Sequence, residues 1–148
     1  MTDRPTLAEL IDAARMHMET NVIPAIRDDR KLYFRTLVAI NVLKIAEREL
    51  ELGADQTAQA WERLNVLEGT ATPMPQNENA LQTVLDDRHR ALGARIRAGD
   101  YDGAENRLAL FAHLEACTID QLKIANPKYL QRIFAENANP ELDAWEGR

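Results

Sequence analysis

Apolar residues recur at helical spacing along almost the whole chain and predict six helical segments. The first begins at Thr6, because Thr6 and Glu9 have the spacing of a capping box, and Pro24 should end or kink it near Asn21. Gly53 should end the second segment, since glycine readily adopts the left-handed conformation that closes a helix. The predicted ranges are 6–21, 30–52, 55–68, 78–98, 102–125 and 128–136.

The segment 30–52 is the most apolar of the six, so we expect it to be the central, most buried helix. Within its apolar stretch, residues 37–46, Asn41 is the one amide side chain. An unpaired buried amide costs about 1 to 3 kcal/mol, so Asn41 should find a polar partner on another helix or on a bound molecule. The segment 55–68 has a narrower apolar face, whereas 102–125 should be buried on two sides.

The composition predicts helix throughout. Alanine, leucine, glutamate and arginine dominate, aromatic residues make up only 5% of the chain, and β-branched runs are few. A length of 148 residues suits one domain that can bury a core. We therefore predict an all-α fold, a single-domain antiparallel bundle of about five to six helices over residues 1–148. Proline and polar residues predict a surface loop at 70–79, and residues 137–148 should form a peripheral tail.

Charge and cysteine content narrow the function classes. The formal net charge of −6 argues against non-specific nucleic-acid binding, which depends on clustered lysine and arginine. Cys117 is the only cysteine, so an internal disulfide is excluded and a reducing, cytoplasmic setting is expected. The first residues lack the order of a signal peptide, and no apolar run reaches the ~18 residues of a membrane span. We expect a protein that is neither exported nor inserted in a membrane.

Catalytic motifs are scarce. The chain contains no serine, which excludes serine-hydrolase chemistry, and it has no glycine-rich phosphate loop. Cys117 and His113 stand at i, i+4, a spacing that suits a nucleophile and its base, but the apolar neighbours of Cys117 favour a buried structural thiol. His17, His89 and His113 fall in three different segments without a metal-binding motif. We therefore assign no catalytic, cofactor-binding or metal-binding residue and predict that the chain is not an enzyme.

His113 and Asp120 lie seven residues apart on one face of the segment 102–125. With Asn41 they can form either an interhelical polar network that fixes helix register or an acid–base pair. The network is the preferred interpretation, because no third catalytic group is evident.

Several blocks of the sequence carry a family resemblance. It covers roughly residues 4–52 and 108–129, whereas the middle of the chain, 54–100, is not distinctive. The chain resembles a family of small bacterial helical proteins of unassigned domain function. That family includes the accessory subunit of the 4-hydroxyacyl-CoA kinase of levulinic acid catabolism. The blocks that carry the resemblance are 4–10, 22–25, 38–50 and 113–129.

The resemblance implies a non-catalytic accessory subunit without a cofactor. Such a subunit would bind and activate or stabilise an aminoglycoside-phosphotransferase-like kinase acting on hydroxyacyl-CoA, next to an acyl-CoA dehydrogenase-like protein. An independent ligand-binding helical bundle and a homodimeric structural protein are the alternatives. The candidate residues for a polar network or partner contact are Arg35, Asn41, His113, Asp120, Lys123 and Tyr129.

Overall fold

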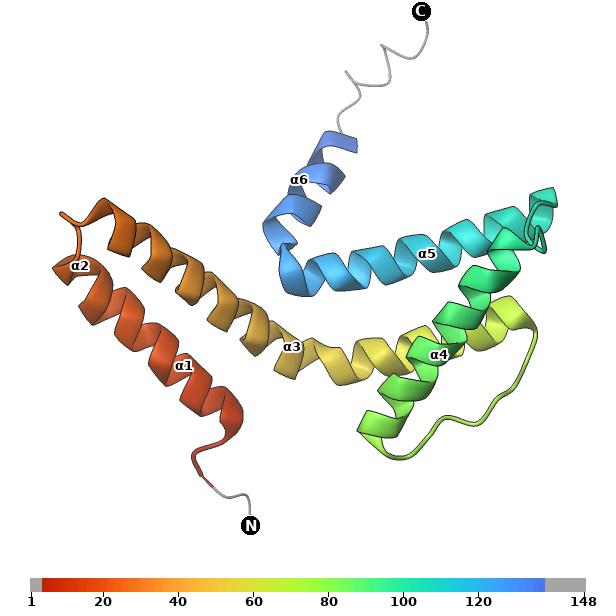
Figure 1. Cartoon of the computed structure of the whole chain (residues 1–148), viewed down its shortest axis with the longest axis horizontal. Helices are drawn as coiled ribbons and strands as arrows, with labels where there is room; N and C mark the ends of the chain where they lie inside the picture. The colour runs from red at the N-terminus through yellow and green to blue at the C-terminus, as the bar shows by residue number, and fades with distance from the viewer. Residues whose placement is uncertain (1–3, 138–148) are drawn as a thin grey trace, which may run out of the picture. The chain divides into compact units, whose positions relative to one another are not determined.

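The computed structural model describes residues 4–137, and all regular structure in this range is helical. The elements are α1 (Leu7–His17), the π-helical turn η1 (Met18–Val22), α2 (Ile23–Ala25), α3 (Arg30–Glu68), α4 (Glu78–Arg97), α5 (Ala104–Ala125) and α6 (Pro127–Asn137) (Figure 1). The all-α prediction is confirmed for this range. Among the described helices, none combines the length and apolar character needed to cross a membrane. Apart from Asn137, the expected tail 137–148 lies outside the described residues.

The contacts within the chain define two compact units. Unit 1 comprises residues 1–53 and unit 2 comprises residues 54–148, so α3 contributes its first part to unit 1 and its last part to unit 2. The prediction of one domain over the whole chain stays a prediction.

Gly53 does not end a helix, and the prediction of separate helices at 30–52 and 55–68 is wrong. α3 runs without a break from Arg30 to Glu68. A glycine inside a helix costs only about 1 kcal/mol relative to alanine, and the good helix formers around Gly53 outweigh that cost. Positive φ is found instead at Gly69 (64°) and Gly99 (88°), which follow the ends of α3 and α4.

Unit 1 contains an antiparallel pair of helices. The predicted capping box is present, because the Glu9 amide donates to Thr6 Oγ1 at 3.2 Å and the Thr6 amide donates to Glu9 Oε2 at 2.7 Å. Arg15 then pairs with Glu47 at 2.8 Å, and Glu19 pairs with Lys44 at 2.7 Å. The partner number falls on α3 as the number rises along α1 and η1, which shows that the two arms run in opposite directions.

Residues 37–46 are covered on one face only, so the expectation that they form the most buried stretch is wrong, and so is the expected burial of Asn41. Thr36 and Ile40 are buried, but Val38, Asn41 and Val42 are exposed. Within unit 1 the first part of α3 has one neighbouring helical arm, formed by α1 and its continuation (Figure 1). A single neighbour covers one face of a helix, so an apolar stretch that extends around most of the circumference leaves its other face uncovered.

Unit 2 contains the larger hydrophobic core, and its centre is the last part of α3. Leu64 is 0% exposed, so the most buried part of α3 lies within residues 55–68 and not within 30–52, where it was expected. The indole of Trp61 donates to the Thr72 carbonyl at 3.0 Å and thereby holds the segment that joins α3 to α4. The buried cluster consists of Ala60, Trp61, Leu64, Leu81, Leu85, Leu92, Tyr101 and Leu110.

α5 is buried along one stripe, and the prediction of burial on two sides is wrong. The stripe follows the helical spacing of Leu110, His113, Asp120 and Ile124, which are all buried. The opposite face carries exposed apolar side chains, of which Leu108 is the most exposed at 71%.

Candidate functional site

The buried stripe of α5 carries polar groups into the interior of unit 2. His113 is only 4% exposed, and Asp120 is also buried. Cys117 lies between them on the same face and is half-buried. One helix face therefore presents an imidazole, a thiol and a carboxylate to the elements that pack on it.

His89 of α4 joins this stripe and forms what we call the His–His–Cys cluster, composed of His89, His113 and Cys117. The Nε2 atoms of His89 and His113 are 3.4 Å apart, and the Sγ atom of Cys117 is 3.7 Å from Nε2 of His113. The three potential ligand atoms all lie within 4.8 Å of one another. This arrangement brings together two histidines that the sequence places in separate helices.

Arg63 of α3 connects the cluster to Asp120. Its Nη2 atom donates to Asp120 Oδ2 at 2.7 Å and lies 4.0 Å from the sulfur of Cys117. Lys123 donates to the other carboxylate oxygen of Asp120 at 3.2 Å. The same guanidinium nitrogen therefore lies close to both the Cys117 sulfur and the Asp120 carboxylate.

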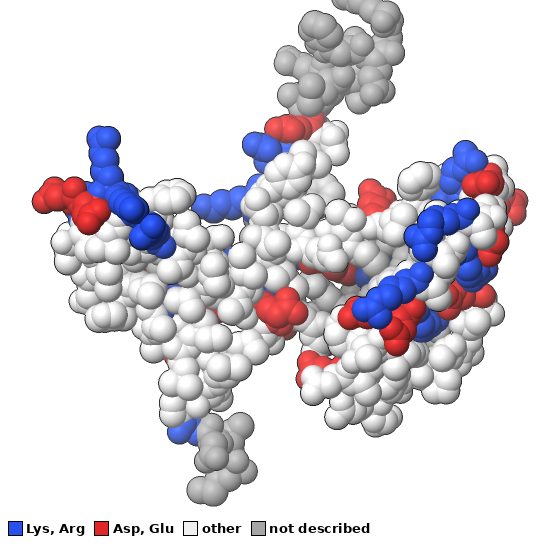
Figure 2. Space-filling model, viewed as in Figure 1, with Lys and Arg blue, Asp and Glu red and all other residues white. Residues whose placement is uncertain are grey.

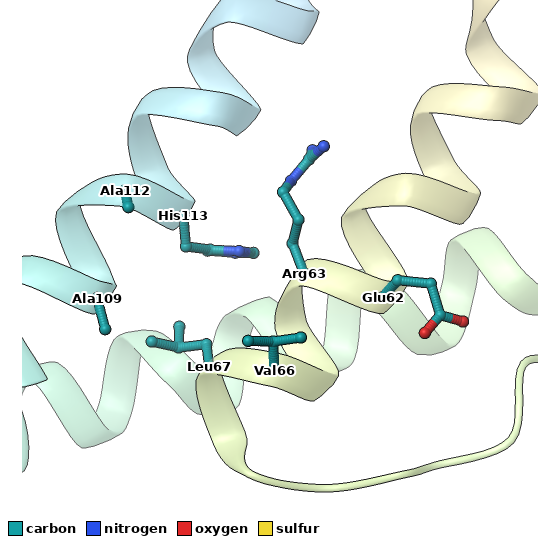
Figure 3. Close-up of a pocket in the computed structure, with 7 residues that line it drawn as sticks. All are labelled: Glu62, Arg63, Val66, Leu67, Ala109, Ala112 and His113. Carbon is teal, nitrogen blue, oxygen red and sulfur yellow. The ribbon is translucent and has the colours of Figure 1, made fainter.

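A cavity of about 450 Å³ lies between α3 and α5 in unit 2. Figure 3 shows His113 extending from α5 toward the part of α3 that carries Arg63. The other walls are mostly aliphatic, which gives an apolar pocket with polar groups from both helices. Its lining residues are Glu62, Arg63, Val66, Leu67, Ala109, Ala112 and His113. A volume of this size falls in the range of about 300 to 1,000 Å³ typical of small-molecule sites.

Burial controls the protonation of both histidines in the cluster. Removal from water lowers the pKa of His89 and that of His113, because the charged imidazolium loses hydration. For His113 the neighbouring His89 lowers the pKa further. Both rings are therefore neutral at neutral pH, and their nitrogens are available as acceptors or ligands.

The free energy of unfolding should decrease as the pH falls below about 6.5, the ordinary pKa of histidine. In that range the unfolded chain protonates His89 and His113, whereas the folded protein, with its lowered pKa values, does so only at lower pH. The unfolded state then binds more protons and gains stability. Urea unfolding across this range in EDTA measures the slope. His113→Gln should flatten it, and the same change at exposed His17 should not.

A second feature, the exposed stripe of unit 1, is composed of Phe34, Leu37, Val38, Asn41 and Val42. These residues lie within an arc of about 140° at 3.6 residues per turn, opposite the buried Thr36 and Ile40. Phe34 is 65% exposed. On the face shown in Figure 2, uncharged residues cover most of unit 1, whereas charged residues gather over α4.

The predicted site residues fall into both units. Arg35 and Asn41 are exposed on the unit 1 part of α3. In unit 2, His113 belongs to the His–His–Cys cluster, and Asp120 pairs with Arg63 and Lys123. Tyr129 of α6 is partly exposed, with the Arg132 guanidinium 5.2 Å from the centre of its ring. The exposure of Asn41 removes the buried amide expected in a three-residue network.

Sequence reasoning missed the roles of Arg63 and His89. Arg63 lies beside the buried Leu64, in the stretch to which only a narrow buried face was assigned. His89 follows the buried Leu85 by four residues, so the helical periodicity of α4 places it near the buried face. That periodicity was the available signal.

The family model of a domain of unknown function (DUF6285) matches residues 24–129, a range that includes both the exposed stripe and the His–His–Cys cluster. No curated protein and no solved structure matches the chain.

Proposed function

The chain belongs to the DUF6285 family of domains of unknown function, and on this premise we propose that it is a non-catalytic accessory subunit. Its partner is an aminoglycoside-phosphotransferase-like kinase acting on hydroxyacyl-CoA, which the chain binds and activates or stabilises. The resemblance of the blocks 38–50 and 113–129 supplies this partner class. An acyl-CoA dehydrogenase-like protein is the neighbouring enzyme that the same resemblance implies.

The exposed stripe is the observation that carries the proposal. Large apolar side chains in contiguous exposed positions are typical of protein-interaction surfaces, and an aromatic residue is a frequent energetic anchor in them. Phe34, Val38 and Val42 follow one another at i, i+4 and i+8 and are all exposed. This spacing suits the seating of a helix against a partner surface.

Asn41 lies near the centre of the stripe, between apolar neighbours on the same face. A bound partner would bury its amide, which would then need hydrogen-bonding groups on the partner, since an unpaired buried amide costs about 1 to 3 kcal/mol. Such a group penalises any apolar surface that cannot pair with it and so favours one partner and one register. Asn41 therefore keeps the contact role predicted for it, but on an exterior surface.

The sequence also indicates which of the two proteins would carry out the chemistry. The sequence lacks a glycine-rich phosphate loop, so the partner kinase would hold the nucleotide and supply the reacting groups. A helical subunit can raise the activity of that kinase by binding its competent conformation more tightly than the others.

Co-expression with an aminoglycoside-phosphotransferase-like kinase, followed by purification through a tag on this chain, tests the proposal. We expect a stoichiometric complex that phosphorylates a hydroxyacyl-CoA, and little activity or poor solubility of the kinase alone. If the kinase is fully active unaided and this chain purifies by itself, the proposal is rejected.

The cavity beside His113 favours one second candidate, a ligand-binding helical bundle. Its aliphatic walls and its volume of about 450 Å³ suit a small apolar group such as an acyl chain. A ligand present at about 100 times its dissociation constant stabilises a protein by roughly 2.7 kcal/mol. Thermal unfolding with CoA and with acyl-CoA measures this effect, and an unchanged midpoint with both would remove this candidate.

A further inference from the structure

We propose that His89, His113 and Cys117 bind a divalent transition-metal ion, for which Zn²⁺ is the best match. The site lies in unit 2 and uses none of the residues of the exposed stripe, so the inference goes beyond the accessory-subunit proposal and does not depend on it.

The spacing of the ligand atoms matches tetrahedral coordination. With Zn–N near 2.0–2.1 Å and Zn–S near 2.3 Å, a tetrahedral ion holds two nitrogens about 3.3–3.4 Å apart and a nitrogen and a sulfur about 3.6 Å apart. The corresponding distances are 3.4 Å between the two Nε2 atoms and 3.7 Å between Nε2 of His113 and Sγ of Cys117. The third pair, His89 and Cys117, is within 4.8 Å, so a small side-chain adjustment closes the triangle.

Hydrogen bonding alone does not explain this convergence. The close contacts from His89 and from Cys117 both point to a single atom, Nε2 of His113. In a neutral imidazole that nitrogen has either one proton or one lone pair, so it can make one good hydrogen bond. One metal ion between the three atoms would use a lone pair from each histidine and the thiolate of Cys117 at the same time.

The donor set decides the class of ion. Two imidazoles and a thiolate favour Zn²⁺ and similar transition metals, whereas Mg²⁺ and Ca²⁺ prefer oxygen ligands. Three protein ligands leave one coordination position for water or another small ligand.

The helices hold the three ligands in a fixed frame. His113 and Cys117 stand one turn apart on α5, and His89 comes from α4. The buried Leu85 and Leu92 of α4 and Leu110 of α5 belong to the same hydrophobic cluster, so the two ligand-bearing helices are anchored in one core. A frame of this kind reduces the conformational entropy that is lost when a metal binds.

Titration of the untagged, EDTA-treated and dialysed full chain with Co²⁺ tests the site, since Co²⁺ substitutes for Zn²⁺ and is coloured. We expect saturation at one equivalent, with visible bands of tetrahedral Co²⁺ and a near-ultraviolet thiolate-to-cobalt charge-transfer band. Addition of Zn²⁺ should remove both sets of bands. Cys117→Ser should abolish the charge-transfer band, because Cys117 is the only cysteine in the chain.

His89→Gln and His113→Gln should each weaken Co²⁺ binding by at least ~10-fold, the lower end of the loss caused by removing an outer-shell partner. His17→Gln is the matched control and should bind like the unmodified chain, since His17 is exposed in unit 1. Circular dichroism checks that each variant is folded. If His113→Gln does not fold, His89→Gln still tests the site, because His89 is only half-buried. A missing charge-transfer band, a band that survives Cys117→Ser, or equal losses for His17→Gln and His89→Gln would each overturn the proposal.

Discussion

Replacement of Val38 by aspartate should abolish co-purification of the kinase partner while the chain stays folded. Val38 lies within the exposed stripe and is 48% exposed, so the new carboxylate is hydrated in the free chain. In the complex the same carboxylate would be buried against an apolar surface without a counter-charge. Loss of a central interface contact costs 2 kcal/mol or more at an energetic hot spot, which corresponds to a roughly 30-fold weaker complex.

Val84→Asp is the matched control for this variant. Val84 is an exposed valine on helix α4 of unit 2, with an exposed fraction of 40%, and it lies outside the stripe. The same chemical change there should leave the affinity for the kinase unchanged. Equal binding by Val38→Asp and the unmodified chain, measured by titration calorimetry, would exclude the stripe as the kinase interface. Equal losses for both variants would point to a general effect of added charge.

Light scattering on the same pair of variants separates the kinase from a second copy of the chain. A homodimer built on the stripe would dissociate into monomers in Val38→Asp, even without any kinase present. The accessory-subunit proposal expects the mass of the isolated chain to be the same for Val38→Asp and Val84→Asp. A lower mass for Val38→Asp alone would assign the stripe to a second copy of the chain, whereas equal masses leave it free for the kinase.

The sequence was a good guide to helix type and a poor guide to which faces are covered. Helical periodicity and the capping box at Thr6 depend on local interactions, and the structure contains both. Gly53 is helical because the good helix formers on both sides of it decide its conformation. The glycine costs about 1 kcal/mol, and the helix propensity of its neighbours offsets that cost. The identity of one residue does not show which of the two is larger.

The apolar stretch around Asn41 shows a second limit. An apolar residue pattern says that a helix has surface to bury, but it does not say how many neighbours are available within the same chain. In unit 1 the first part of α3 has one neighbouring helical arm, so Thr36 and Ile40 are buried and Val38 and Val42 are exposed. An apolar surface that the chain does not cover by itself is where a partner becomes the natural explanation.

The His–His–Cys cluster shows a third limit. His113 and Cys117 were paired from the sequence because i, i+4 neighbours on a helix always share a face. His89 contacts His113 from a different helix. Periodicity defines the buried face of each helix, but it does not define which two faces pack together. Arg63 was missed for the same reason, since its pairing with Asp120 joins residues 57 positions apart.

Among the variants proposed, Leu64→Ala should cause the largest loss in the free energy of unfolding. It tests whether the core of unit 2 lies where the structure places it. Leu64 is 0% exposed at the centre of the unit 2 cluster. Truncation of a fully buried leucine removes its apolar contacts and leaves a cavity, which costs about 2 to 5 kcal/mol. A natural domain has only about 5 to 15 kcal/mol of stability, so the urea midpoint of Leu64→Ala should fall markedly.

Leu108→Ala is the matched control, with the same substitution on a helix of the same unit at a side chain that is 71% exposed. Its unfolding free energy should change by less than about 0.5 kcal/mol, as expected for a surface position. A loss for Leu108→Ala as large as that for Leu64→Ala would mean that the outer face of α5 is covered in solution. Repeating the measurement over a range of protein concentrations then identifies the cover. If a second copy of the chain provides it, the midpoint rises with concentration, because association stabilises only the folded chain.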